Sequence, residues 1–156
     1  MVKRLSLLAC ALLLTASARA DVITKKFDWA PGASGVQKLD FEWNNLSVAQ
    51  VTWNLGNTLK PLRVSSASAE VRVDNNGFLD QVVGIAIAVF DEQGNMIAAG
   101  SGGNKLGHLD KGERDHFRIA FPYVYRNLDK AKSFYLTLET GAEKWKAKEP
   151  AKAPSQ

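Results

Sequence analysis

Apolar and polar side chains alternate along most of this chain, in short runs separated by glycine, asparagine, aspartate and proline. Between residues 37 and 43 the odd positions from Leu39 to Trp43 are apolar, whereas the even positions are charged. This period of two is typical of strands that bury one face. After the first 20 residues, no stretch keeps the apolar spacing of a helix over three turns. We expect eight strands, at residues 22–29, 37–43, 48–55, 62–74, 81–90, 96–101, 114–121 and 133–140, and a short helical turn within 123–132.

The run 81–90 carries β-branched residues on one side and mainly small residues on the other. It predicts a central strand whose second face is closely covered. Residues 100–112 are rich in glycine and predict a long connection to the strand at 114–121. With eight strands and no helix long enough for a parallel crossover, the pattern predicts an all-β fold, an antiparallel sandwich of two sheets.

The first 20 residues have the form of an export signal. Lys3 and Arg4 are followed by an apolar stretch at 5–14, and residues 18–20 place alanine at the two positions that a signal peptidase reads. The apolar stretch is about half of the ~20 residues that a membrane-spanning helix needs. We therefore expect cleavage rather than a membrane span, and an exported protein that is periplasmic or secreted.

Cleavage after Ala20 would leave a chain without cysteine, because Cys10 is the single cysteine. Such a chain enters an oxidising compartment without disulfides, so its stability must come from its core, and thiolate catalysis is excluded. Residues 7–10 also resemble a lipoprotein cleavage box, which keeps lipidation of Cys10 as an alternative. We divide the chain into a signal peptide at 1–20, a sandwich domain at 21–140 and a disordered tail of lysine, alanine and proline at 141–156.

The formal net charge of +4 and the isoelectric point of about 9.2 do not describe the expected domain. Residues 1–20 contain three basic and no acidic side chains, and residues 141–156 contain four basic and two acidic ones. Residues 21–140 contain 13 basic and 14 acidic side chains. Without a basic folded surface, nucleic acid is not expected as a partner.

Residues 69–121 resemble a known family in their strand and turn motifs. Val89-Phe90-Asp91 stands before Gly94, and Leu109-Asp110-Lys111-Gly112-Glu113 leads into the next strand. This outline resembles the FxLYD-type immunoglobulin-like modules of exported bacterial proteins and the related late-embryogenesis-abundant-like sandwiches. Val89-Phe90-Asp91 occupies the place of Leu-Tyr-Asp in that family, and Lys111 replaces the proline of its Pro-Gly-Glu turn. The resemblance implies an immunoglobulin-like β-sandwich without catalytic activity.

His108, Asp110, Asp115 and His116 form a cluster with the residue types of a metal site. Imidazole and carboxylate groups bind divalent ions, and His116 could act as a general base. However, the two histidines lack metal-ligand spacing, and Asp115 and His116 are neighbours in an expected strand and so point to opposite faces. We expect a polar loop that enters an edge strand, with no metal, and keep His108, Asp110 and His116 as the alternative metal set.

The glycine-rich stretch around Ser101 resembles two catalytic motifs only superficially. Ala99 stands where a nucleophile elbow requires glycine, and no Gly-Lys-Ser/Thr sequence follows to bind phosphate. Its glycines would still leave backbone amides open to a partner. The expected contact residues are Ser101, Gly102, Gly103 and Asn104.

Trp29, Trp43 and Trp53 could together form a platform for sugar rings. Each shares its strand face with other apolar residues, and burial of one ring contributes about 2–3 kcal/mol. We therefore expect them in the core, with Trp29 the first candidate for exposure. Tyr123 and Tyr125 add an aromatic pair in a loop and complete the candidate binding residues.

Taken together, these observations predict an exported, non-enzymatic β-sandwich that needs no cofactor and binds another protein of the cell envelope or the medium. A carbohydrate-binding module that uses an exposed Trp29 is the first alternative. A small metal-assisted hydrolase that uses His108, Asp110 and His116 is the second.

Overall fold

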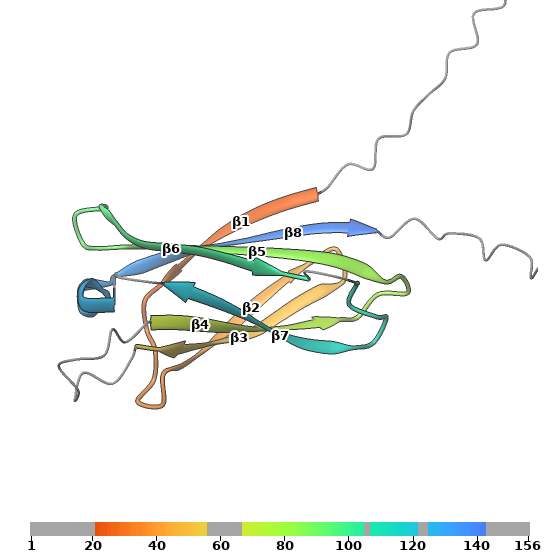
Figure 1. Cartoon of the computed structure of the whole chain (residues 1–156), viewed down its shortest axis with the longest axis horizontal. Coiled ribbons are helices and arrows are strands. Elements are labelled where there is room, and N and C mark those ends of the chain that lie inside the picture. The colour runs from red at the N-terminus through yellow and green to blue at the C-terminus, as the bar shows by residue number, and fades with distance from the viewer. Residues whose placement is uncertain (1–20, 56–66, 105–106, 122–124, 143–156) are drawn as a thin grey trace, which may run out of the picture.

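Two four-stranded antiparallel sheets pack face to face in the computed structural model (Figure 1). It describes residues 21–55, 67–104, 107–121 and 125–142. The fold predicted from the alternation, an all-β antiparallel sandwich of eight strands, is confirmed. The elements are β1 (Asp21–Asp28), β2 (Val36–Trp43), β3 (Leu46–Asn54), β4 (Ala67–Asn75), β5 (Gln81–Phe90), β6 (Met96–Gly103), β7 (Arg114–Phe121), the 3-10 helix η1 (Tyr125–Lys130) and β8 (Ser133–Ala142).

The strands are ordered β1-β8-β5-β6 in one sheet and β2-β3-β4-β7 in the other. β5 is an interior strand with β8 and β6 on its two sides, as its apolar sequence predicts. The hairpin from β5 to β6 and η1 lie at one end of the sandwich, and the β4–β5 connection lies at the opposite end (Figure 1). The described residues contain no helix long and apolar enough to cross a membrane.

The core lies between the inner faces of the two sheets. Val83, Ile85, Ile87 and Val89 of β5 all point inward and are buried, which explains why every second residue of this strand is β-branched. At one end of the core, aromatic rings replace aliphatic side chains. The ring of Phe134 lies 5.1 Å from that of Trp53, an arrangement that fills the space between the sheets without a disulfide.

A two-residue turn joins β2 to β3. Asn44 and Asn45 have φ angles of 48° and 62°, the left-handed backbone that a tight hairpin with the twist of its strands requires. Asparagine adopts this conformation more readily than other residues with a side chain. The turn pairs Trp43 with Leu46 and so sets which residues of β2 and β3 face the core.

The predicted connection at residues 100–112 is wrong in its first part, because β6 continues to Gly103. Gly100 and Gly102 face β7, where a Cβ atom on Gly100 would lie 2.8 Å from the carbonyl oxygen of Ala120 and 2.8 Å from Cγ2 of Ile119. The absence of side chains therefore lets the edges of the two sheets approach each other. These glycines serve close packing rather than mobility.

Candidate functional site

The outer faces of the two sheets differ in character. The outer face of β2-β3-β4-β7 carries long charged side chains, and oppositely charged residues stand opposite each other on neighbouring strands. Glu70 pairs in register with Arg118, and Asp74 pairs with Arg114. Such cross-strand pairs are typical of a sheet face that remains in water.

The outer face of β1-β8-β5-β6 carries small side chains in its centre. Gly84, Ala86 and Ala88 of β5 lie beside Ala99 and Ser101 of β6. Among the described residues, no helix or strand packs over this face, and the three β5 residues are only half-buried. The close cover predicted for the second face of β5 is therefore not supplied by the described part of the chain.

Three hollows follow one another along this face, because β5 has no long side chain to separate them. The first has a volume of about 680 Å³, the middle one about 390 Å³ and the third about 430 Å³. The first two share Ala88 and Tyr135, and the middle and third share Ser101. We call the whole depression the β5 trough, and its outward-facing residues on β5, β6 and β8 are Val82, Gly84, Ala86, Ala88, Phe90, Ala99, Ser101, Tyr135, Thr137 and Glu139.

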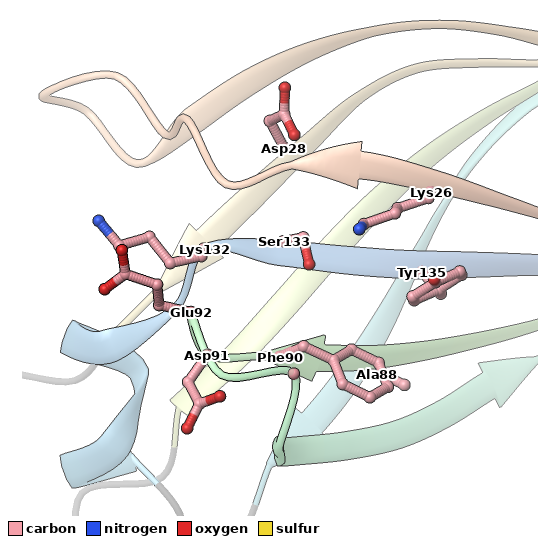
Figure 2. Close-up of a pocket in the computed structure, with 10 residues that line it drawn as sticks. Lys26, Asp28, Ala88, Phe90, Asp91, Glu92, Lys132, Ser133 and Tyr135 are labelled. Carbon is pink, nitrogen blue, oxygen red and sulfur yellow. The ribbon is translucent and has the colours of Figure 1, made fainter.

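The first hollow is formed where β1, β8 and the end of β5 meet (Figure 2). Tyr135 is 37% exposed, and its ring and that of Phe90 form a T-shaped pair with a centroid distance of 5.3 Å. The Nζ atom of Lys26 lies 5.9 Å from the centroid of the Tyr135 ring, within range of a cation–π interaction. The hollow thus has an aromatic wall that is already contacted by a cation.

Side chains of both charges surround this hollow, namely Lys26, Asp28, Asp91, Glu92 and Lys132 (Figure 2). Asp91 begins the turn after β5, where its Oδ1 accepts a hydrogen bond from the Asn95 amide at 2.8 Å and its Oδ2 accepts one from Asn95 Nδ2 at 3.0 Å. The side-chain hydrogen bond from Asn95 holds the pKa of the Asp91 carboxyl below its usual value. Asp91 therefore stays ionised at the rim of the hollow.

The third hollow collects four of the residues that the sequence predicts as contacts. Ser101, Gly102, Gly103 and Asn104 all line it, together with Glu139 of β8. The Oδ1 atom of Asn104 accepts a hydrogen bond from the Val83 amide at 2.9 Å, which attaches the end of β6 to β5. The four residues are thus brought together by strand pairing rather than by a flexible loop.

Trp29 and Trp53 do not line the β5 trough. Trp29 is half-buried against the core, and its ring centroid lies 4.3 Å from that of Trp53, which is 4% exposed. Trp29 and Trp53 therefore form no sugar platform together. Tyr123 lies outside the described residues, and Tyr125 is the first residue of η1.

A second group of polar side chains lies just before the start of β5, at the end of this strand away from the first hollow. Asp80, His108 and Asp110 each place one potential ligand atom within 4.8 Å of those of the other two. His108 Nε2 lies 3.0 Å from Asp110 Oδ1 and 3.5 Å from Asp80 Oδ2. His116, which the alternative metal set includes, is instead exposed on β7 opposite Arg72. The structure thus replaces His116 with Asp80 in this group.

Sequence reasoning missed Lys26, Phe90 and Tyr135 in the first hollow, and Asp80 in the polar group. The alternation places Tyr135 on the outward face of its strand, but Lys26 joins it only through the pairing of β1 with β8. Likewise, Asp80 approaches His108 because Gln81, the first residue of β5, and Leu109 of the β6–β7 connection form an isolated bridge. These pairings link residues far apart in the chain, so no local pattern predicts them.

Neither a protein-family model nor a curated protein matches this sequence.

Proposed function

We propose that this protein is an exported, non-enzymatic binding module, and that the β5 trough holds an elongated segment of a partner protein of the cell envelope or the medium. The observation that carries the proposal is the open face of β5, an interior strand whose outward residues Gly84, Ala86 and Ala88 are small and apolar. At about 3.3 Å a residue, the ten residues of β5 extend over roughly 30 Å. That length suits a polymer chain rather than a compact small molecule.

The composition of the trough favours a polypeptide over a glycan. Sugar rings stack on aromatic faces, and among the described trough residues the aromatic ones, Phe90 and Tyr135, occupy one end and contact each other. The middle of the trough is lined by Ala86, Ala88 and Ala99, whose methyl groups suit aliphatic side chains, together with the hydroxyl groups of Ser101 and Thr137. A partner segment would place apolar residues there and polar residues near Lys26 and Glu92.

The resemblance of residues 69–121 to immunoglobulin-like modules points the same way, because such modules are generally non-catalytic. The membership of this chain in that family stays a prediction, as do the immunoglobulin-like topology and the export of the chain.

The experiment is site-specific photocrosslinking in the native organism, followed by binding of a defined peptide. A photoreactive residue replaces Ser101 in the trough or, as the control, Ala120 on the outer face of β7. We expect a protein adduct from position 101 and none from position 120. A synthetic peptide that covers the crosslinked segment of the partner then serves as the ligand in calorimetry.

Two matched variants test the site. Ala86→Arg places a long cation on the floor of the trough, and Ala120→Arg makes the same change on the other outer face, where the side chain is exposed. We expect Ala86→Arg to weaken peptide binding at least tenfold, equivalent to about 1.4 kcal/mol, and Ala120→Arg to leave it unchanged. Adducts only from position 120, or equal affinity for both variants, would overturn the proposal. A glycan that binds the native chain but not the Ala86→Arg variant would favour the carbohydrate-binding alternative.

A further inference from the structure

We propose that Asp80, His108 and Asp110 form a binding site for a divalent transition metal of the zinc type. The site shares no residue with the β5 trough: none of the three lines any of its hollows, although the third hollow begins at Val82, two residues after Asp80.

The distances within the group suit a metal. Ligand atoms about 2.0–2.2 Å from a zinc ion lie roughly 3–3.5 Å from one another. The two contacts of His108 Nε2 measure 3.0 Å to Asp110 Oδ1 and 3.5 Å to Asp80 Oδ2. An ion between the three groups would therefore need only small side-chain movements.

The backbone beneath the site is held in place by a buried asparagine. The side chain of Asn75, which is fully buried, donates hydrogen bonds of 3.0 Å to the carbonyl oxygens of Leu79 and Leu109. The residues that follow Asp80 and His108 are joined by two hydrogen bonds, from Gln81 N to Leu109 O and from Leu109 N to Gln81 O. The two connections that supply the ligands are thus fixed to each other.

The carboxylate of Asp80 is also oriented from outside the site. Its Oδ1 accepts a hydrogen bond from the Lys111 amide at 3.2 Å, and its other oxygen is the one near His108. Metal-binding carboxylates generally have such supporting hydrogen bonds, which reduce the cost of ordering them around an ion. For Asp110 it is the backbone that is held, because its amide donates to Glu113 Oε2 at 3.0 Å.

The donor set indicates the kind of metal. One imidazole nitrogen and two carboxylate oxygens suit zinc and its neighbours, whereas calcium takes six to eight oxygen ligands. The side chains of His108 and Asp110 are partly exposed, so water can complete the coordination. The ion would link the β4–β5 connection to the β6–β7 connection in place of the ion pairs that His108 makes when its imidazole is protonated.

The test is zinc binding by the full chain produced without a histidine tag and freed of metal with a chelator. We expect one equivalent of zinc to bind, with calcium unable to compete. His108→Ala, Asp80→Asn and Asp110→Asn should each weaken zinc binding by at least about tenfold. His116→Ala is the matched control, since it removes the other imidazole of the chain from an exposed position on β7, and should leave zinc affinity unchanged.

A second measurement needs no variant and so does not depend on whether a variant folds. In nuclear magnetic resonance spectra of the native chain, zinc should shift the imidazole signals of His108 and leave those of His116 in place. No zinc binding, binding that His108→Ala preserves, or binding that His116→Ala abolishes would each overturn the proposal. In those cases the contacts of His108 with Asp80 and Asp110 only hold the β4–β5 and β6–β7 connections together. Ala86→Arg in the trough should not change zinc affinity, so the two proposals can fail separately.

Discussion

Asp74 stands between two guanidinium groups on the polar outer face. Its carboxylate accepts hydrogen bonds from Arg72 Nη2, at 3.3 Å, and from Arg114 Nε. Burial raises the pKa of this carboxyl, but the hydrogen bonds from the two arginines outweigh burial and lower the pKa below its ordinary value of 3.8. Because the folded state holds this carboxylate ionised more strongly than the unfolded chain does, the interaction stabilises the fold above about pH 4. The stabilisation is lost as the pH falls further, through the folded-state pKa.

Asp74→Asn should therefore lower the free energy of unfolding by about 1 kcal/mol at neutral pH, as expected for a partly exposed ion pair. The difference from the native chain should shrink at acidic pH, well below the ordinary value of 3.8, where Asp74 takes up a proton. Urea unfolding of the native chain and the variant at neutral and at acidic pH measures this difference in stability. Glu42→Gln, which neutralises an exposed carboxylate on the same face, is the control and should change stability by less than about 0.5 kcal/mol. A deficit for Asp74→Asn that is equal at both pH values would contradict the electrostatic explanation.

At the level of elements, β6 shows how one residue type can serve two structural purposes. Gly100 and Gly102 lie inward, and a Cβ atom on Gly102 would lie 3.1 Å from the carbonyl oxygen of Arg118 on β7. A run of glycine and serine suits either a mobile connection or a strand that another backbone approaches closely. The local sequence predicts a mobile connection, and only the position of β7 establishes a closely packed strand.

Gly100→Val should lower the free energy of unfolding by about 2 kcal/mol, because its side chain has no room against Ala120 and Ile119 of β7. Ala99→Val changes the neighbouring residue, which points outward and is exposed, and should alter stability by less than about 0.5 kcal/mol. Thermal and urea unfolding of both variants provide the comparison. Equal stability of the two would mean that β6 does not pack against β7.

At the level of the whole molecule, the first strand begins where the export signal is expected to end. Asp21, the residue after the expected cleavage site, pairs in register with Thr140 of β8. Cleavage after Ala20 would therefore leave β1 complete, and the fold would lose none of its described strands.

Protein recovered from the cell envelope or the medium should begin at Asp21, as measured by mass spectrometry of the intact chain. Ala18→Arg should block processing and leave the longer precursor, because signal peptidase requires a small residue there. Cys10→Ser should have no effect on the mature mass. Loss of membrane attachment in Cys10→Ser would instead show that Cys10 is lipidated and that the chain is anchored.

The sequence alone determined the fold class and most strand positions. Alternation with a period of two reports which face of each strand is buried, and this is a local property of residues that are neighbours in the chain. It placed the core residues of β5 and the outward position of Tyr135 correctly. The asparagines at 44 and 45, which lie between two of the expected strands, adopt the left-handed backbone that their local preference favours.

Only the tertiary structure decided which outward residues meet. The β5 trough depends on β8 and β6 as the neighbours of β5, and the polar group depends on contact between two connections about 30 residues apart. Pairing of distant strands is chosen by the total burial of both sheets and by hydrogen bonding along whole strands, not by any short segment. For that reason the sequence pointed to His116 beside His108, whereas the folded chain brings Asp80 there.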